Sequence, residues 1–386
     1  SNLSFLSKVM EKVVLKQLLS YLNSHDLISH TQSAYRPVHS TETALIKVTN
    51  DILDGLDGGD ESVLTLLDLS AAFDTIDHTT LLKRLSTLYG ISGPALAWFE
   101  SYLCGRTQAV LVAGQMSPLV PLSFGVPQGS VLGPILFIMY TKPLSSLIQT
   151  HSVSNQSFAD DTQLYKSSPP SQTHAAILAV QTCIVDVKDW MSHNKLKLND
   201  DKTEALLFRK RSARLTDGPT SIRVGDTDIC FSSSARNLGF TITSDMTLDK
   251  HISNICRSAY FELRKISTIR HTLSVQTTNT LVCAFVLSKL DYCNSLLSGC
   301  PLYLIQKLQK LQNSAARLVL KARKSDHATP LLRTLHWLPI KSRIDYKLST
   351  LCFNFFSGSS PAYFSELLTV YTPTRQLRSS SDTRIL

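Results

Sequence analysis

The sequence of 386 residues has no long uninterrupted run of apolar residues. The longest run, residues 131–140, contains a glycine and a proline and is far shorter than the roughly 18 residues that a membrane-spanning helix needs. The first residues also lack the layout of a secretory signal, because Lys8, Glu11 and Lys12 interrupt the apolar positions. We therefore expect an intracellular protein of the nucleus or the cytoplasm, neither secreted nor carrying a transmembrane segment.

The eight cysteines include no C-x-x-C pair and no close Cys/His cluster, so the sequence indicates neither a disulfide scaffold nor a zinc knuckle. They are typical of small buried side chains in a reducing compartment. With 43% hydrophobic and 18% charged residues, the composition excludes an intrinsically disordered chain and a fibrous one. The length predicts two or three domains, or one large unit with several lobes.

Acidic residues are scarce in one part of the chain. Residues 250–343 hold fifteen lysines and arginines against three acids, a net charge of +12 within a total of +9. The rest of the chain is therefore slightly acidic and carries a basic C-terminal lobe. Such a lobe is typical of proteins that bind phosphate backbones, although a solvated basic face has the same composition.

The hydrophobic pattern predicts an amphipathic helix over residues 4–22 and a buried strand over 62–67 that ends at Asp68. The three glycines and four aspartates of residues 50–61 predict a turn-rich connection. Further helices are expected over 79–89, 95–102, 134–140 and 177–191, strands over 205–208, 222–224, 229–231 and 238–242, and helices again from 248 to about 347. The serine-rich end from Thr372 is expected to be poorly ordered.

Three aspartates stand where strands or turns would expose them. Asp68 follows the strand over 62–67, and Asp160 and Asp161 lie in a predicted hairpin turn. Mg²⁺ prefers carboxylate oxygens, and two such ions about 3.5–4 Å apart can activate a hydroxyl and stabilise the leaving oxygen in phosphoryl transfer. On the residues alone, solvated turn aspartates remain the alternative.

The surroundings of these aspartates resemble the sequence blocks of reverse transcriptases. Residues 67–74 (Leu-Asp-Leu-Ser-Ala-Ala-Phe-Asp) resemble the first catalytic block, and residues 158–161 (Phe-Ala-Asp-Asp) resemble the aromatic-x-Asp-Asp block. Residues 125–134 contain Pro-Gln-Gly and resemble the block that contacts the incoming nucleotide and the template. Residues 32–37, 199–203 and 238–240 resemble the fingers, lysine-bearing and primer-grip blocks, and all six stand in family order over about residues 1–245.

Within this family the sequence is most similar to the reverse transcriptases of non-LTR (long interspersed element) retrotransposons. Those proteins carry a segment similar to residues 336–343 after the thumb. The resemblance implies an α+β fold of the right-hand polymerase class. It assigns residues 1–62 to partial fingers, 63–245 to the palm with inserted fingers elements, 246–350 to a helical basic thumb and post-thumb region, and 351–386 to a C-terminal tail. Because the chain begins at Ser1 inside the first fingers block, we expect an N-terminally truncated protein that lacks the endonuclease.

The resemblance implies an RNA-directed DNA polymerase that binds an RNA template, a DNA primer and dNTPs. It makes Asp68, Asp160 and Asp161 the catalytic residues and the ligands of two Mg²⁺ ions, for which Mn²⁺ could substitute because it shares oxygen ligands. Lys202 would donate a proton to the leaving pyrophosphate as a general acid. A solvent-facing lysine among acids is the alternative for Lys202.

Four further residues are expected at the substrate. Phe73 would exclude a ribose 2′-hydroxyl, Gln128 would hydrogen-bond a sugar or base edge, Gly129 would let the backbone approach the nascent pair, and Arg36 would meet phosphate or template. Ordinary packing, a plain turn or solvent exposure are the alternatives. Asp74 keeps open an RNA-templated RNA polymerase, against which the Pro-Gln-Gly block argues.

A basic helix over residues 304–324 is expected to hold nucleic acid by charge. Its leucines form one arc, and its basic residues form another about 110° away. The basic arc consists of Lys307, Lys310, Arg317, Lys321 and Lys324. A catalytically inactive nucleic-acid-binding remnant of a retrotransposon remains the main alternative to an active enzyme.

Overall fold

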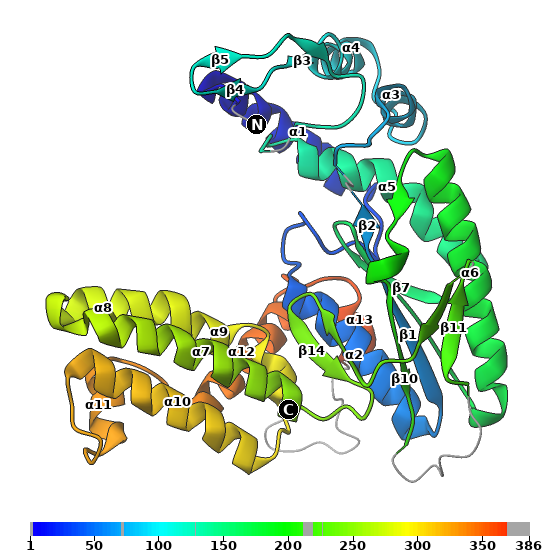
Figure 1. Cartoon of the computed structure of the whole chain (residues 1–386). Helices are drawn as coiled ribbons and strands as arrows, with labels where there is room; N and C mark the ends of the chain where they lie inside the picture. The colour runs from blue at the N-terminus through cyan, green and yellow to red at the C-terminus, as the bar shows by residue number, and fades with distance from the viewer. Residues whose placement is uncertain (1–2, 71–72, 128, 211–218, 226, 369–386) are drawn as a thin grey trace, which may run out of the picture. The chain divides into compact units, whose positions relative to one another are not determined.

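The structure is a computed structural model that describes residues 3–70, 73–127, 129–210, 219–225 and 227–368 (Figure 1). The chain folds as two compact units. One unit combines Ser1–Pro37 with Ile52–Ser232, and the other combines Val38–Asp51 with Ser233–Leu386. Fingers, palm and thumb remain predicted assignments of these stretches.

A four-stranded antiparallel sheet is the centre of the first unit, with strand order β10-β1-β8-β7. These strands are β1 (Glu61–Leu67), β7 (Ser154–Phe158), β8 (Asp161–Ser168) and β10 (Glu204–Phe208). β1 pairs with both β8 and β10, and almost all of its residues are buried. Four of its seven residues are apolar and almost all are buried, as in a strand covered on both faces, so the predicted strand over 62–67 is confirmed.

Two long helices, α5 (Gly133–Thr150) and α6 (Thr173–His193), pack beside this sheet and against each other (Figure 1). α6 buries Ile177, Val180 and Ile184 at helical spacing, which confirms the predicted stripe. α5 begins next to a proline at its first turn, as predicted, but continues ten residues beyond the expected end at Tyr140. Burial of its apolar face outweighs the cost of the internal proline.

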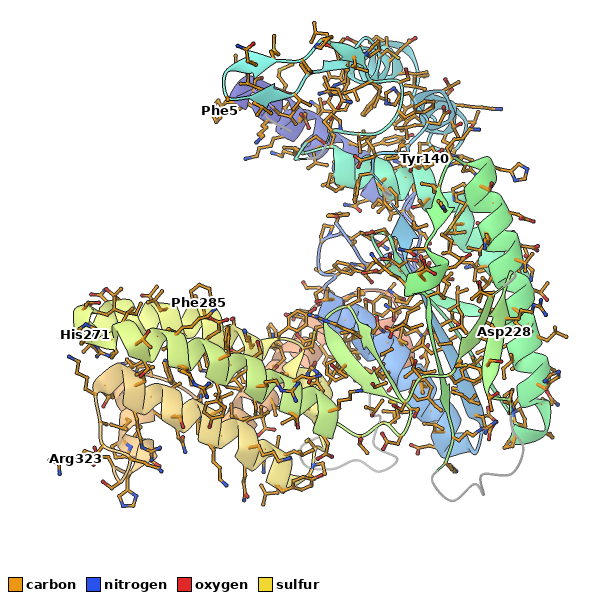
Figure 2. The ribbon with its side chains drawn as sticks, in the orientation of Figure 1. Phe5, Tyr140, Asp228, His271, Phe285 and Arg323 are labelled. Carbon is orange, nitrogen blue, oxygen red and sulfur yellow. The ribbon has the colours of Figure 1, made fainter. Side chains whose placement is uncertain are left out.

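The remaining helices of the first unit are α1 (Phe5–Ser24), α3 (His78–Thr87) and α4 (Gly93–Leu103), all confirmed within a few residues. Its other short strands are β2 (Leu69–Ser70), β3 (Thr107–Gln108), β4 (Leu111–Val112), β5 (Gln115–Met116), β6 (Val120–Pro121), β9 (Lys197–Leu198), β11 (Ser221–Val224) and β12 (Thr227–Cys230). The start of α1 is largely uncovered, and Figure 2 shows the Phe5 side chain pointing outward.

In its described residues, the second unit is helical apart from the hairpin of β13 (Ser234–Asn237) and β14 (Phe240–Thr243). Its helices after the hairpin are α7 (Asp249–Ile269), α8 (Val275–Val282), α9 (Ser288–Asp291), α10 (Leu302–Leu320), α11 (Ala328–Thr334), α12 (Ile340–Phe356) and α13 (Phe364–Leu367). Helices α7 to α12 share one apolar core, to which α10 contributes fully buried Leu308 and Leu311.

The prediction of a turn-rich connection over 50–61 was wrong, because α2 (Thr41–Gly58) runs through most of it. Gly55, inside the helix, costs about 1 kcal/mol relative to alanine, and Gly58 is its last residue. Buried Leu45, Val48 and Ile52, at three- and four-residue spacing, offset that cost. The helix ends before Gly59, whose φ of +95° suits glycine.

Two further boundaries were wrong. The strand predicted over 238–242 begins only at Phe240, because Leu238 and Gly239, both with positive φ, form the turn of the hairpin of β13 and β14. The basic helix ends at Leu320, because Lys321 takes a left-handed conformation with φ of +54°. The serine-rich end from Thr372 lies outside the described residues. Among the helices that the structure describes, none is long and apolar enough to cross a membrane.

Candidate active site

The hairpin of β7 and β8 carries the paired aspartates. Phe158 pairs with Asp161, so Ala159 and Asp160 form a two-residue turn and Asp161 is the first residue of β8. The turn thus lies one residue earlier than predicted. Ala159 has a φ of +58°, which is uncommon for a residue with a side chain, and Gly is the usual choice at such a hairpin position.

Asp68 reaches the same end of the sheet from the neighbouring strand. Leu67, the last residue of β1, pairs with Thr162 of β8, so the chain enters Asp68 beside the start of β8. The carbonyl oxygen of Asp68 accepts a hydrogen bond of 2.9 Å from the backbone N–H of Asn199. The topology therefore gathers at one sheet end the three aspartates that stand 92 and 93 positions apart in the sequence.

Desolvation and the negative charges of neighbouring aspartates raise the pKa of Asp160 and of Asp161. Desolvation, together with the charge of Asp68, raises the pKa of Asp160. Desolvation of its carboxyl group, followed by the charges of Asp160 and Asp68, raises the pKa of Asp161 to about 6, although the residue as a whole is exposed. Clustered carboxylates of this kind disfavour their own ionisation, and a bound cation would relieve that repulsion.

The donors of the cluster fit a hard divalent cation. Asp68 Oδ2 is buried and accepts no hydrogen bond from the residues that the structure describes. In the described part of the chain, however, no three His, Cys, Asp or Glu side chains are already close enough to hold a metal ion. The carboxylate oxygens and the negative charge of the aspartates therefore suit Mg²⁺, but their side chains are not arranged around a common point.

Lys202 lies beside Asp68, and its expected role as a general acid stays a prediction. Its Nζ atom is 3.4 Å from Asp68 Oδ2, on a side chain that is 69% exposed. It ends a short 3₁₀ turn, Asp200–Lys202, which Lys188 anchors by an ion pair of 2.5 Å to Asp200. The ammonium group thus occupies the position of a cation beside Asp68 Oδ2, a buried carboxylate oxygen that accepts no hydrogen bond from the described residues.

Phe73 lies beside the start of the Pro-Gln-Gly block. Its carbonyl oxygen accepts a hydrogen bond of 2.9 Å from Val126 N–H, and its ring centroid is 4.9 Å from that of Phe137. A Cβ atom on Gly125 would lie 2.8 Å from the carbonyl oxygen of Asp74. The loops that contain Gly125 and Asp74 are therefore in close contact at this glycine. Gly129 is exposed with a φ of +86°. Gln128 lies outside the described residues.

Arg36 is half-buried, and its Nη1 atom donates to the carbonyl oxygens of Ser29 and Gln32 at 2.8 and 3.1 Å. These contacts close its own loop, and its expected role at phosphate or template stays a prediction. The preceding residue, Tyr35, is 47% exposed, and burial together with the charge of Asp160 raises the pKa of its phenol. This segment therefore lies within electrostatic reach of the aspartate turn.

The basic residues of α10 have several neighbours in their own unit. Lys307 Nζ is 3.9 Å from Asp249 Oδ1, and Arg317 donates to the carbonyl oxygen of Asp326 through two of its nitrogens. Lys310 is exposed on the helix. Lys321 and Lys324 are exposed but lie beyond the end of the helix, so the five residues do not form one continuous helical arc.

Two buried polar residues of the site were not predicted. Gln32 is 6% exposed and bonds the backbone of Ala159. Glu11 is 2% exposed, and its Oε2 accepts from Val131 N–H and Leu132 N–H at 2.6 and 3.1 Å. A signal for Glu11 exists in the sequence, because it stands seven residues before buried Leu18 and so on the buried face of α1.

Comparison with known proteins identifies relatives over most of the chain. The chain is 27% identical over 312 residues to the RNA-directed DNA polymerase from mobile element jockey of Drosophila melanogaster, covering 79% of this chain and 32% of that protein. It is 25% identical over 394 residues to the probable RNA-directed DNA polymerase from transposon BS of the same species, covering 98% of this chain and 41% of that protein. The chain thus spans well under half the length of these relatives.

Among solved structures, apo telomerase from Candida tropicalis aligns with a TM-score of 0.47 at 14% identity, covering 94% of this chain and 57% of that chain. Residues 1–242, more than half of the chain, match the family described as reverse transcriptase (RNA-dependent DNA polymerase). The predicted resemblance and the α+β right-hand polymerase class are thereby confirmed. The chain belongs to the reverse transcriptase family.

Proposed function

We propose that this chain is an RNA-directed DNA polymerase that adds dNTPs to the 3′-hydroxyl of a primer paired with an RNA template. The observation that carries the proposal is the gathering of Asp68, Asp160 and Asp161, with Lys202, at one end of the central sheet. This placement suits phosphoryl transfer, in which charge must be stabilised on the attacking, transferred and leaving oxygens.

Asp68, Asp160 and Asp161 would hold Mg²⁺, or Mn²⁺ in its place. When bound, two such ions would neutralise charge that develops on the phosphate oxygens. The carboxylates would orient the reacting groups at the sheet end. Lys202, with its ammonium beside Asp68, would hold a proton for the pyrophosphate that leaves.

Phe73 and the 125–134 block would form the wall against which the sugar of the nucleotide lies. The bond between Phe73 and Val126 keeps the aromatic residue next to that block. An RNA template and a DNA primer are the expected partners, in line with the RNA-directed DNA polymerase activity that the names of the relatives state.

A nucleic-acid-binding protein without catalysis is the second candidate. It is favoured by the ion pair between Lys202 and Asp68 and by the lack, among the described residues, of a group of three side chains already arranged for a metal ion. In that case the basic second unit would still bind template and primer. Extension of a primer distinguishes the two candidates.

The test is extension of a DNA primer on an RNA template with dNTPs and Mg²⁺, using the wild-type chain and Asp160→Asn. We expect the substitution to lower the extension rate by at least about 100-fold, because metal-assisted charge stabilisation is worth several kcal/mol and each 1.4 kcal/mol is tenfold. Template–primer binding should stay within about twofold.

Asp228→Asn is the matched control, since Asp228 is an exposed aspartate on β12 (Figure 2). It should extend primers like the wild type. A wild-type chain that binds template–primer but extends nothing would overturn the polymerase proposal in favour of the binding protein. Extension with rNTPs in preference to dNTPs would instead indicate an RNA-templated RNA polymerase.

A further inference from the structure

We infer that Gln32 is a positioning residue that holds the aspartate turn in its catalytic conformation. This inference rests on the proposed function, because it assigns a role to Gln32 through the residues that would hold the metal. Gln32 lies outside the hairpin, 127 positions before Ala159 in the sequence, and was not among the predicted site residues.

The side-chain amide of Gln32 binds both polar groups of Ala159. Its Oε1 atom accepts from Ala159 N–H at 2.9 Å, and its Nε2 atom donates to the Ala159 carbonyl oxygen at 3.2 Å. Oε1 also accepts from Ala34 N–H at 2.9 Å, which fixes the amide to its own segment. A carbonyl oxygen has two lone pairs, so both bonds to Oε1 can form together.

The backbone around Gln32 is itself attached to the edge of the sheet. Ser33 N–H donates to the Ser157 carbonyl oxygen at 2.9 Å, and Ser157 N–H donates to the Thr31 carbonyl oxygen at 2.8 Å. Gln32 therefore forms a short parallel bridge with Ser157 of β7, which stands two residues before Ala159 of the turn. With 6% of its surface exposed, it is a buried amide in a fixed position.

Ala159 is the residue of the turn that needs such support. Its φ of +58° brings its Cβ atom close to the backbone, so the turn conformation is costly for alanine and not for glycine. Strained residues of this kind persist only where their surroundings hold them. The two bonds from Gln32 act on this peptide unit, directly before Asp160.

The small cavity beside the turn shows how close Gln32 lies to the catalytic carboxylate. Gln32, Ala159 and Asp160 all line a space of about 30 Å³. Loss of the amide would enlarge this space and free the turn, so that Asp160 and Asp161 would populate other orientations. Metal affinity and turnover should then fall while template–primer binding is kept.

The experiment compares Gln32→Ala with Gln156→Ala as a matched control. Gln156 is also buried, lies at the same bridge and donates to Ser33 Oγ at 2.7 Å, but it does not bind Ala159 in the structure. Both variants are measured for folded fraction, template–primer binding, kcat and KM for dNTP, and affinity for Mn²⁺ by electron paramagnetic resonance without nucleotide. The same substitutions are repeated in an Ala159→Gly background.

We expect Gln32→Ala to weaken Mn²⁺ binding and lower kcat by about 10-fold or more, the size of effect known for residues that orient metal ligands. Gln156→Ala should change both by less than about 3-fold in the folded protein. Ala159→Gly should restore part of the Gln32→Ala loss, because glycine adopts positive φ without support, and should not alter the effect of Gln156→Ala.

The inference is overturned if Gln32→Ala and Gln156→Ala lose activity and Mn²⁺ affinity equally, or if Ala159→Gly restores nothing. A wild-type chain that extends no primer counts against the proposed function alone, since the Mn²⁺ measurements and the coupling to Ala159 still test Gln32. Reduced template–primer binding as the main effect of Gln32→Ala would also contradict a role at the turn.

Discussion

Phe73 is tied to its surroundings in two ways. Its backbone binds Val126 and its ring packs on Phe137, so the side chain is both part of the core edge and a neighbour of the nucleotide-contacting block. The sequence could place Phe73 five residues after Asp68 but could not show this pairing, which joins segments more than fifty positions apart.

We expect Phe73→Val to raise the ratio of kcat/KM for rNTP over dNTP by about 10-fold or more, because a smaller side chain leaves room for the 2′-hydroxyl. Steady-state extension with each nucleotide measures the ratio. Asp74→Ala is the comparison, since Asp74 is the alternative sugar-sensing residue. An unchanged ratio for Phe73→Val with a changed one for Asp74→Ala would transfer the role to Asp74.

The aspartates illustrate what residue types alone could predict. The residue types and the local strand and turn were sufficient to place Asp68, Asp160 and Asp161 at strand ends, although Asp68 and Asp160 are half-buried and not exposed as expected. Their common location follows from the pairing of β1 with β8, a contact between distant segments that no local pattern encodes. The resemblance to a family supplied that information. The role of Gln32 depends on the φ of Ala159, which the sequence does not reveal.

At the scale of elements, α1 and α5 are joined by a buried carboxylate. Glu11 of α1 accepts from two backbone N–H groups just before α5, where the positive end of the helix dipole favours an anion. The same carboxylate accepts from Ser7 Oγ at 3.0 Å. Glu11 therefore fixes the entry to α5 and, with it, the end of the Pro-Gln-Gly block.

Glu11→Ala should lower the free energy of unfolding by about 2–3 kcal/mol, because it leaves one buried and one partly buried N–H group without their charged acceptor. Denaturant titration measures the loss. Lys12→Ala, one residue further on the exposed face of α1, should change stability by no more than about 0.5 kcal/mol. Equal effects of the two variants would show that the carboxylate does not anchor α5.

The basic residues of α10 and of its C-terminal cap lead to a prediction about salt. Replacing Lys310, Arg317 and Lys321 by Gln should weaken template–primer binding equally for unrelated sequences, because charge and not base contact is involved. The slope of log K against log salt should flatten by up to about 0.9 per lost phosphate contact, as measured for B-DNA. Binding at several salt concentrations tests this, and turnover of the bound complex should change little.

An unaltered salt slope would show that this face is merely solvated. The contact would then have to be sought on α7, at Arg257, Arg264 and Lys265. Arg270 is excluded, since it is 6% exposed and donates to the carbonyl oxygens of Leu273, Leu318 and Val319.

The elements also show which patterns are reliable. The stripe of α6 and the apolar run of β1 were predicted because each buries one continuous set of side chains with a clear period. α2 was not predicted because the three glycines and four aspartates of residues 50–61 indicated turns more strongly than the apolar spacing indicated a helix. The end of α10 was missed because a lysine, and not a glycine, adopts the left-handed conformation that terminates it.

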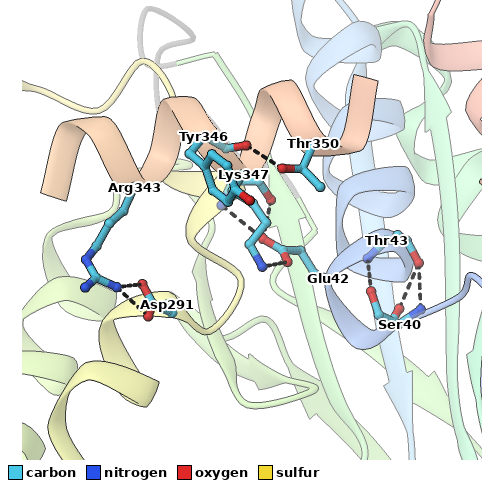
Figure 3. A network of polar contacts seen from close by, with 9 residues as sticks. Ser40, Glu42, Thr43, Asp291, Arg343, Tyr346, Lys347 and Thr350 are labelled. Carbon is cyan, nitrogen blue, oxygen red and sulfur yellow. Dashed lines mark hydrogen bonds and ion pairs between the residues drawn. The ribbon is translucent and has the colours of Figure 1, made fainter. Parts of the chain in front are cut away.

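At the scale of the whole molecule, the second unit is assembled from two distant parts of the chain. Glu42 of α2 accepts from Ser295 N–H and Oγ at 3.1 and 2.6 Å, and forms an ion pair of 3.3 Å with Lys347 (Figure 3). Tyr363 OH donates to Thr43 Oγ1 at 3.0 Å. Residues 38–51 are therefore part of the helical unit that continues after residue 232.

We expect Glu42→Ala to destabilise the protein by about 2–3 kcal/mol, below the roughly 3–5 kcal/mol for breaking a fully buried pair, because Lys347 is partly exposed. Glu366→Gln is the matched control. Glu366 pairs with Lys47 at 2.6 Å on a side chain that is 66% exposed, and such pairs contribute at most about 1 kcal/mol. Thermal unfolding measures the loss of stability of the two variants. A loss for Glu366→Gln as large as that for Glu42→Ala would contradict the prediction.

The division of α2 between the two units has a consequence for synthesis on the ribosome. The central sheet can close once Phe208 has emerged, because all four of its strands precede that point. The first half of α2 must wait far longer, since Glu42 meets Ser295 and Lys347 only after more than 250 further residues have been made. Until then Leu45 and Glu42 lack the partners that bury them, and contacts of such sequence separation form slowly. The nascent chain therefore carries a half-buried helix while more than 250 further residues are made, and residues 41–51 are a segment that a chaperone would protect during that time.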